Sequence, residues 1–407
     1  MQRNFDENTI KLLREQVRFL VGDAETVCQM QTRPSREPFS EEVCSFLADL
    51  SGRLMKMPES RAYSDVMTYA FWIRKASLEA MKTRFPVPEG YLRLGRGTVF
   101  HIAPSNVPVN FAYSLTAALL LGNANIVRVS QKEFLQVELI ARAMRETLAD
   151  HPALQGKLAL VRYERSREIN DAFSAIADTR IVWGGDATIA ELRKSPLPPR
   201  GTEITFADRY SIAVINADDY LKLEDPAGFA RSFYNDTYFS DQNACTSPRV
   251  VAWTGKKKAE AKESFWKNLH DLVKEEYAFQ DIQGVNKLTS AYLACNALKG
   301  ASVIPSEDNL IVRIQVSQLN ADLQEYFENS GFFFEYDCDD IMDLRELCNN
   351  IKCQTVGYLG DREAFLPLLQ SGIRGIDRIV PIGRTMDFDL IWDGYDLPAM
   401  LTRLVRV

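Results

Sequence analysis

The stretch Thr98-Val-Phe-His-Ile-Ala-Pro-Ser-Asn-Val-Pro108 decides the fold that we expect for this chain. Its first six residues are mainly apolar and predict a buried strand, and Pro104 and Pro108 frame the turn that follows. Residues 110–121 then predict a helix, and Ala124-Asn-Ile-Val-Arg-Val129 predicts a second strand. Strand, helix and strand in this order predict two parallel strands joined by a right-handed crossover.

The alternation of strands and helices continues along the chain. Helices are expected at residues 134–148, 169–177 and 187–193, and strands at 158–163 and 180–185. This pattern predicts an α/β fold, a doubly wound parallel sheet that binds a nucleotide outside the carboxyl ends of its strands. The run Ser195-Pro-Leu-Pro-Pro-Arg-Gly201 looks like a linker, and beyond it the alternation resumes in a second α/β domain.

Two further regions complete the expected organisation. The second domain is predicted to contain strands at 212–216, 250–253, 309–314, 331–336 and 355–360, with helices at 228–234 and 259–276. Residues 6–82 show helical periodicity, and these helices are expected to pack on the cofactor domain. We therefore expect a helical region (1–90), a nucleotide-binding domain (91–207), a catalytic α/β domain (208–385) and a candidate oligomerisation tail (386–407).

The composition excludes several functional classes. The chain has 407 residues, 46% of them hydrophobic and 25% charged, which is typical of a globular protein. Its net charge of −7 argues against a nucleic-acid binder. It has no apolar run of about 18 residues that would cross a membrane, and its first residues lack the apolar core of a secretory signal. Seven scattered cysteines fit a reducing cytoplasm, and with only three histidines no metal site is expected.

Cys245 is the first candidate for chemistry. It lies in a polar turn, with Asn243 and Thr246 nearby, just before the predicted strand at 250–253. Most unpaired cysteines are small hydrophobes of the core, and that interpretation stays open here. A thiol in a polar turn can instead face a cleft, where backbone amides favour the nucleophilic thiolate.

Two residues at the ends of the first predicted strands are further candidates. Asn106 would place an amide donor at the carboxyl end of the sheet, where a tetrahedral oxyanion needs one. Alternatively, it caps the helix that begins near residue 110. Arg128 would hold a ribose 2′-phosphate, which the neutral side chain of Gln131 would not repel. Alternatively, Arg128 is a solvated arginine at a strand end.

A pair of glycines follows the predicted strand at 180–185. Gly184 and Gly185 permit a close approach of the backbone to a phosphate, next to the start of a helix. Asp186 is expected to cap that helix rather than to bind a ligand.

Several motifs together resemble the aldehyde dehydrogenase superfamily, and within it the acyl-CoA reductase branch (LuxC-like, bioluminescence fatty-acid reductase). The segments that carry the resemblance are Pro104-Ser-Asn-Val-Pro108, Gly122-Asn-Ala-Asn-Ile-Val-Arg-Val129, Trp183-Gly-Gly-Asp186, Asp241-Gln-Asn-Ala-Cys-Thr-Ser-Pro-Arg249, Gly375-Ile-Asp-Arg-Ile-Val-Pro-Ile-Gly383 and Trp392-Asp-Gly-Tyr-Asp-Leu397. The resemblance runs from about residue 93 to the end of the chain. It implies an aldehyde-dehydrogenase-like fold with a helical N-terminal region.

The resemblance also implies an activity and a set of site residues. The activity is reduction of an acyl-CoA, or another acyl thioester, to the aldehyde through a covalent acyl-cysteine. The implied cofactor is NADPH, with NADH as the alternative, and CoA is the co-product. The implied catalytic residues are Cys245 and Asn106. The implied cofactor-binding residues are Pro104, Ser105, Arg128, Ser130, Gln131, Gly184 and Gly185, and the implied substrate-tunnel residues are Val107, Asn110, Phe111 and Ser114.

The chain departs from the superfamily pattern at one glutamate. Aldehyde-oxidising members activate water with it, whereas here the aligned residue is Thr205, and Glu203, two residues away, is expected to face the other way. An acyl-enzyme without this base suits exchange with a thiol rather than with water. A second glutamate of the family, which orients the nicotinamide ribose, has only a distant counterpart in Glu328.

Two other functions remain as alternatives. A non-redox cysteine acyltransferase or thioesterase would need His101, His151 or His270 to reach Cys245. The other alternative is an inactive scaffold subunit that partners an acyl synthetase, and such an acyl-activating enzyme is also a candidate partner of the reductase. The resemblance and the apolar tail 397–407 suggest a homodimer or a larger assembly.

Overall fold

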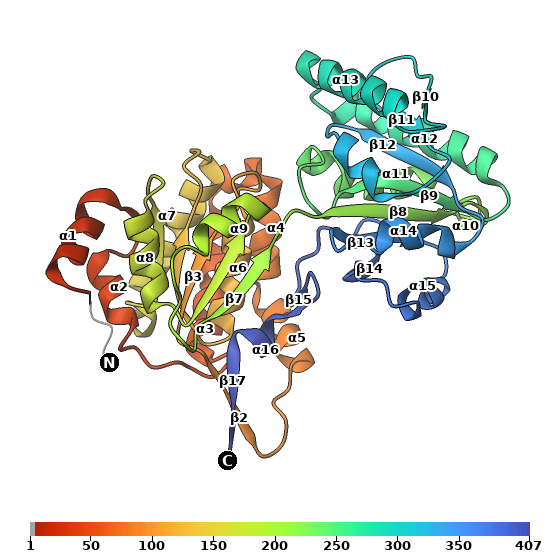
Figure 1. Cartoon of the computed structure of the whole chain (residues 1–407). Coiled ribbons are helices and arrows are strands. Elements are labelled where there is room, and N and C mark those ends of the chain that lie inside the picture. The colour runs from red at the N-terminus through yellow and green to blue at the C-terminus, as the bar shows by residue number, and fades with distance from the viewer. Residues whose placement is uncertain (1–4) are drawn as a thin grey trace. The chain divides into compact units, whose positions relative to one another are not determined.

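The structure is a computed structural model that describes residues 5–407, and the chain divides into two compact units (Figure 1). Unit 1 comprises the chain up to Ala207 together with Tyr395–Val407, and unit 2 comprises Asp208–Gly394. The residues expected to form a separate tail are thus shared between the units. The Pro-rich run that was expected to be a linker connects α9 (Asp186–Leu192) to β7 (Thr202–Phe206) within unit 1.

Unit 1 is built on a six-stranded sheet. Its strands are β1 (Arg18–Val21), β3 (Thr98–Ile102), β4 (Ala124–Arg128), β5 (Leu158–Arg162), β6 (Thr179–Trp183) and β7, in the order β1-β5-β4-β3-β6-β7. All of them run parallel except β1, which pairs antiparallel with β5. Every residue of β3, β5 and β6 is buried, as expected for strands covered on both faces. From β3, the chain adds β4 and then β5 on one side of the sheet, and it adds β6 on the other side of β3. The topological switch point, where this strand order reverses, therefore lies between β3 and β6.

Helices cover both faces of this sheet. They are α1 (Glu7–Gln16), α2 (Ala24–Met30), α3 (Glu41–Lys56), α4 (Ser64–Trp72), α5 (Lys75–Arg84), α6 (Asn110–Leu120), α7 (Leu135–Ala149), α8 (Arg167–Ile176) and α9, with 3-10 turns η1 (Pro58–Ala62) and η2 (Pro152–Leu154). Apolar residues of α1, α2, α8 and α9 pack in one core with β3, β4, β5 and β6. Helix α6 connects β3 to β4 and contacts both, and α3 packs on α7.

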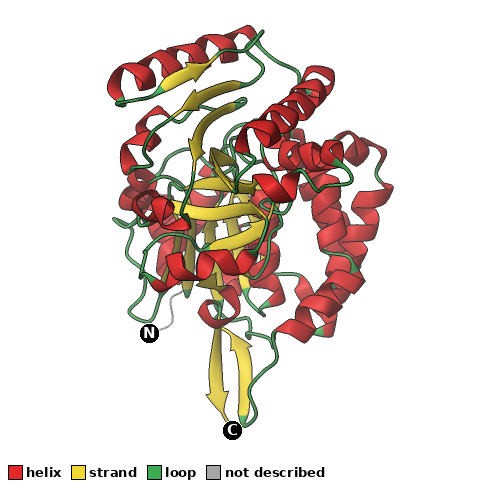
Figure 2. Cartoon of the chain, turned by 90° about the vertical axis from the view of Figure 1, so that its right-hand side faces the viewer, coloured by secondary structure: helices red, strands yellow, loops and turns green. Residues whose placement is uncertain are grey.

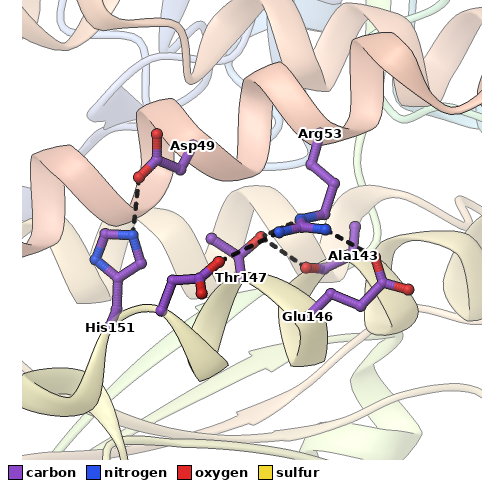
Figure 3. Close-up of polar contacts among 7 residues, drawn as sticks. Asp49, Arg53, Ala143, Glu146, Thr147 and His151 are labelled. Carbon is purple, nitrogen blue, oxygen red and sulfur yellow. Dashed lines mark hydrogen bonds and ion pairs between the residues drawn. The ribbon is translucent and has the colours of Figure 1, made fainter.

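Polar contacts join α3 to α7 (Figure 3). Arg53 of α3 donates to Glu146 at 3.0 Å and to Thr147 at 3.2 Å, and His151, which follows α7, contacts Asp49 at 2.9 Å. These contacts fix the helical N-terminal region on the sheet that it covers.

The C-terminal segment of unit 1 forms a two-stranded ribbon with an earlier strand. Strand β17 (Thr402–Arg406) pairs antiparallel with β2 (Tyr91–Gly95), and Figure 2 shows the two strands side by side. Helix α16 (Leu397–Met400) and strand β16 (Tyr395–Asp396) precede β17 in unit 1, and the short strand β15 (Ile391–Trp392) belongs to unit 2.

Unit 2 is built on a seven-stranded sheet. Its strands are β8 (Tyr210–Asn216), β9 (Pro248–Thr254), β10 (Ser302–Ile304), β11 (Val312–Gln315), β12 (Phe332–Asp337), β13 (Cys353–Leu359) and β14 (Arg378–Pro381), in the order β10-β11-β12-β9-β8-β13-β14. All but β10 are parallel. The helices are α10 (Ala217–Tyr220), α11 (Pro226–Asp236), α12 (Lys258–Glu276), α13 (Asp281–Ala297), α14 (Arg345–Cys348) and α15 (Leu366–Gln370), with 3-10 turns η3 (Tyr238–Ser240), η4 (Ala321–Tyr326), η5 (Ile341–Leu344) and η6 (Arg362–Phe365).

The structure confirms the α/β class and corrects some local expectations. The N-terminal region is not wholly helical, because Arg18–Val21 forms the edge strand β1. Helix α13 and the β2–β17 ribbon were not predicted. Asp186 is the first residue of α9, whose cap position is held by Gly185, so the expectation that Asp186 is the cap was wrong.

Two features are absent from the described residues. No helix within 5–407 is long and apolar enough to cross a membrane. Over the same residues, no group of three or more histidine, cysteine or acidic side chains is placed to hold a metal ion.

Candidate active site

We call the segment from Asp241 to Ser247 the nucleophile loop. Hydrogen bonds from the buried side chain of Gln242 stabilise it. The Gln242 side chain is fully buried, and its Oε1 accepts hydrogen bonds from the backbone N–H groups of Gly331 (2.7 Å) and Phe332 (3.1 Å). Its Nε2 donates to the carbonyls of Pro248 (3.0 Å) and Phe332 (3.2 Å). One amide thus satisfies four backbone groups that would otherwise be buried unpaired.

Further contacts fix the backbone of this loop. Asp241 and Gln242 both have φ of +52°, a left-handed conformation that side chains adopt at a cost. Tyr277 donates to the Asp241 carboxylate, and Arg249 donates to the carbonyl of Gln242. Ser211 at the start of β8 donates to the carbonyl of Cys245 at 2.8 Å. Contacts within unit 2 therefore fix the conformation of the loop.

The Cys245 side chain is partly exposed, but its thiol is poorly solvated. Burial raises the pKa of this thiol to about 12, and the Asp393 carboxylate contributes to the increase. The Gln354 side chain, the backbone N–H of Cys245 and the charge of Arg209 act against this and lower it. The backbone amide thus favours the thiolate, as expected from the sequence, but the effect of burial is larger and the pKa of the thiol is raised.

Polar residues that the sequence did not single out surround Cys245 in unit 2. Gln354 of β13 donates to the carboxylate of Asp393, and Arg209 donates to Asp377 at 3.2 Å. Burial raises the pKa of Asp393 to about 7, whereas Arg378 and Arg209 lower it. Asp393 lies in the tail motif that carries the family resemblance, and that motif was the only signal for it in the sequence.

Asn106 lies in the turn after β3, at the carboxyl edge of the unit 1 sheet. Asn106 and Ser105 are exposed there, and Pro104 is partly exposed. Helix α6 begins at Asn110, and Val109 holds its cap position. The alternative in which Asn106 merely caps α6 therefore has no support from the helix geometry.

Arg128 ends β4 at the same edge. Its guanidinium lies 4.6 Å from the centre of the Tyr163 ring and donates to the Tyr163 carbonyl at 3.3 Å. Its Nε is buried and has no partner within the described part of the chain. Ser130 is partly exposed, and Gln131 is exposed. Arg128 is thus a packed arginine with an unused donor, not a freely solvated one.

Gly184 and Gly185 follow β6 at this edge and are partly exposed. A Cβ atom at Gly184 would lie 3.2 Å from Cγ2 of Thr188, so a larger residue would crowd the turn. The carboxyl ends of β3, β4 and β6 are neighbours in the sheet. They bring together all the residues expected to bind the cofactor: Pro104, Ser105, Arg128, Ser130, Gln131, Gly184 and Gly185.

The four residues expected to line a substrate tunnel separate into two pairs. Val107 and Asn110 are partly exposed, whereas Phe111 and Ser114 are buried. The Ser114 hydroxyl contacts Nδ1 of His101 at 2.8 Å and accepts from Trp183 at 3.0 Å, so it belongs to a polar network inside unit 1.

All three histidines have partners other than a thiol. His101 is fully buried, its Nε2 contacts Asn125 at 2.9 Å, and burial lowers its pKa to about 4. His151 contacts Asp49, and His270 in unit 2 contacts Asp308 at 2.8 Å. These contacts give no support to a cysteine hydrolase that relies on a histidine base.

The two glutamates considered from the sequence are engaged elsewhere. Glu203 of β7 pairs with Arg180 at 2.5 Å and with Arg193 at 2.7 Å. The expectation that it faces away from Thr205 was wrong, because residues two apart on a strand share a face; both are partly exposed, while Ile204 between them is buried. Glu328 accepts hydrogen bonds through its carbonyl from Arg249 and through its carboxylate from Ser290 at 3.4 Å.

Solved structures with a similar fold are aldehyde dehydrogenases. Aldehyde dehydrogenase 21 from Physcomitrella patens has a TM-score of 0.67 at 12% identity, covering 93% of this chain and 88% of that one. Lactaldehyde dehydrogenase from Escherichia coli has a TM-score of 0.65 at 13% identity, covering 99% and 91%. At these identities the likeness shows the fold, which is aldehyde-dehydrogenase-like.

Curated relatives carry a more specific name. A long-chain acyl-protein thioester reductase from Photorhabdus laumondii is 23% identical over 336 residues, which are 81% of this chain and 67% of the relative. One from Aliivibrio fischeri is 24% identical over 203 residues, which are 49% of this chain and 40% of the relative. The match to the second relative thus spans less than half of its length. The sequence model of the acyl-CoA reductase (LuxC) family matches residues 7–407, and the chain therefore belongs to this family.

Proposed function

We propose that this protein reduces an acyl thioester to the aldehyde with NADPH, through an acyl group carried by Cys245. The observation that carries the proposal is the nucleophile loop. In a chain of the acyl-CoA reductase family, buried side chains hold one cysteine in a fixed and partly exposed turn before β9. Holding a turn in a left-handed conformation costs folding free energy. A nucleophile needs a precisely fixed position, which these contacts give to Cys245.

In the proposed reaction, Cys245 sulfur attacks the thioester carbonyl, and the bond from that carbon to the departing thiol breaks. The departing thiol leaves with the proton of Cys245. The cofactor, when bound, supplies the hydride that reduces the acyl-cysteine. The bond from carbon to Cys245 sulfur then breaks, aldehyde is released, and the sulfur takes up a proton from solvent, which restores the thiol. For Asn106 we keep the role that the family resemblance implies, a hydrogen-bond donor to the oxyanion, together with the backbone N–H of Cys245.

The position aligned with the water-activating glutamate supports reduction over hydrolysis. Thr205 cannot act as a base at neutral pH, and the carboxylate of Glu203 is held by two arginines. An acyl-enzyme without a base for water persists long enough to accept a hydride or a thiol.

The residues at the carboxyl edge of unit 1 fit a nicotinamide dinucleotide. The positive charge of the partly exposed Arg128 suits a 2′-phosphate, which favours NADPH over NADH, and the glycines after β6 allow a phosphate to approach the backbone. Ser130, Gln131, Pro104 and Ser105 would complete the binding surface. This assignment is part of the proposal.

The acyl donor is proposed as a thioester of CoA or of a protein thiol. The names of the curated relatives refer to acyl-protein thioesters, which an acyl-activating partner enzyme would supply. Of the proposed tunnel residues, Val107 and Asn110 are the two with exposed surface, and this lining favours a short or polar acyl group over a long alkyl chain.

The test is NADPH oxidation and aldehyde release with acyl-CoA thioesters of increasing chain length, and with an acylated carrier protein. Wild type is expected to oxidise NADPH only when a thioester is present, and Cys245→Ala is expected to lose at least about a thousandfold in rate. Cys295→Ala, which changes another partly exposed cysteine of unit 2, should keep wild-type activity. Thioester-dependent oxidation that survives in Cys245→Ala would refute the assignment.

A further inference from the structure

The outer face of α13 carries no charge along most of its length, and in this it differs from α12, which precedes it in unit 2. Every exposed residue of α12 except Ala259 is charged. Between Ile282 and Ala297, all of which the structure describes, no exposed residue is charged. Four of these exposed residues are large and apolar, with exposed fractions of 56–69%: Ile282, Val285, Tyr292 and Leu293. Single exposed apolar residues are common, but a contiguous apolar patch marks an interaction surface.

The exposed residues of α13 have the spacing of a helix that packs against another helix. Intervals of three and four residues, which define the seam of a coiled coil, separate these exposed positions: Ile282, Val285, Thr289, Tyr292 and Asn296. We call these five residues the α13 seam. The Thr289 hydroxyl donates to the carbonyl of Val285 at 2.8 Å, so it keeps a partner when the seam is covered. The helix contacts β10, the edge strand of the unit 2 sheet (Figure 1).

The inner face of α13 is fixed by contacts of its own. Gln283 donates to the hydroxyl of Tyr277 at 2.9 Å. The fully buried Lys287 donates to the carbonyl of Leu310 at 3.2 Å and to that of Ser330 at 2.6 Å. Since the seam residues lie on the exposed face, substitutions there can test an interaction without disturbing these buried contacts.

We propose that the α13 seam is an interface between two copies of the chain, in which the two α13 helices pack antiparallel across a two-fold axis at Thr289. In such a pair, each residue faces the residue that lies equally far on the other side of Thr289. Val285 then packs against Leu293 of the second copy, and the small Thr289 lies where the two helices approach each other. Both copies bury the same surface, as a two-fold interface requires.

Charge favours a second copy, in this orientation, as the occupant of the seam. The chain has a net charge of −7, so two copies repel each other least where the facing surfaces are uncharged. The exposed charged residues that flank the seam are Asp281, the first residue of α13, and Lys299, just beyond its end. Antiparallel packing brings Asp281 of each copy toward Lys299 of the other, whereas parallel packing would bring like charges together. The antiparallel arrangement also opposes the two helix dipoles.

The first experiment is disulfide cross-linking of cysteine variants of the full chain, with copper phenanthroline as the oxidant and a non-reducing gel as the readout. Thr289→Cys is expected to form a dimer that a reductant reverses, because the two-fold axis brings the two sulfurs together. Ile282→Cys alone should not cross-link, since its two copies would lie about 20 Å apart along the helices. It should cross-link with Asn296→Cys when the two variants are mixed and exchange subunits.

The matched control is Lys267→Cys at an exposed position of α12, which should behave like wild type with its native cysteines. Failure of Thr289→Cys to cross-link beyond this control would overturn the proposal. Cross-linking of Ile282→Cys alone, as readily as Thr289→Cys, would show a parallel or non-specific contact and would also overturn it.

The second experiment measures the molar mass in solution by light scattering over a range of protein concentrations. Val285→Lys would bury a charge on each side of the axis and is expected to raise the dissociation constant of the α13 contact at least about tenfold. Ala259→Lys, which adds the same charge at an exposed position of α12, should associate like wild type. If residues 397–407 form a further contact, Val285→Lys should lose half of the wild-type mass.

Two results of this measurement would overturn the proposal. One is an unchanged mass of folded Val285→Lys at every concentration. The other is a wild type that remains monomeric, which would assign the seam to a different protein. Neither experiment requires turnover, so both report on the seam even if the chain proves not to be a reductase.

Discussion

The two units use opposite edges of similar parallel sheets. In unit 1, the candidate ligand-binding residues follow the carboxyl ends of β3, β4 and β6, and all of them are at least partly exposed. In unit 2, the candidate chemical group lies before the amino end of β9, inside a packed set of amides, carboxylates and arginines. In the proposed function, the unit 1 edge binds the cofactor and the unit 2 edge holds the nucleophile.

The largest expected effect tests how firmly the unit 2 edge is fixed. Gln242→Leu removes the partner of two buried N–H groups and two carbonyls, so it should lower the free energy of unfolding by about 4 kcal/mol or more. Urea denaturation would measure this, with Gln370→Leu as the exposed control. A loss below about 1 kcal/mol would mean that the loop does not depend on this amide.

The next effect concerns acid stability in unit 1. Because burial lowers the pKa of His101 from 6.5 to about 4, the unfolded chain binds a proton at a higher pH than the folded chain. Stability should therefore fall as the pH decreases from 6.5 to 4, by an amount on the order of 3 kcal/mol. In His101→Gln this part of the pH dependence should disappear, whereas His151→Gln should retain it; urea unfolding at a series of pH values measures both.

The smallest effect concerns the cofactor edge. If Arg128 binds the 2′-phosphate, Arg128→Ala should raise the KM for NADPH about tenfold and leave the KM for NADH nearly unchanged. Steady-state kinetics with both cofactors would show this. Equal changes for the two cofactors would indicate that the arginine only supports Tyr163.

The difference between the edges also explains what the sequence could predict. The turn around Asn106 and the end of β4 at Arg128 follow from local patterns of strand, turn and helix. Cys245 was found through its local motif. Gln354 was missed because the pairing of β13 with β8, which no local pattern encodes, decides its place in the sheet, and Asp393 was missed because its contact with Gln354 joins segments that are distant in the sequence.

Other errors have similarly physical causes. The strand Arg18–Val21 was assigned to a helix because its apolar residues continue the spacing of α1, and only pairing with β5 decides its conformation. The expected orientation of Glu203 was wrong because residues two apart on β7, such as Glu203 and Thr205, point to the same face. Its two arginine partners come from β6 and from the end of α9, so they could not be inferred from β7 alone.

The return of Tyr395–Val407 to unit 1 has a consequence for biosynthesis. Unit 2 is one continuous segment that leaves and re-enters unit 1, so all of its strands exist before the last thirteen residues are made. Unit 1, in contrast, lacks the β17 partner of β2 until residues 402–406 have been made. Since domains fold as units, unit 1 can complete its fold only after all of unit 2, with the nucleophile loop, has been synthesised.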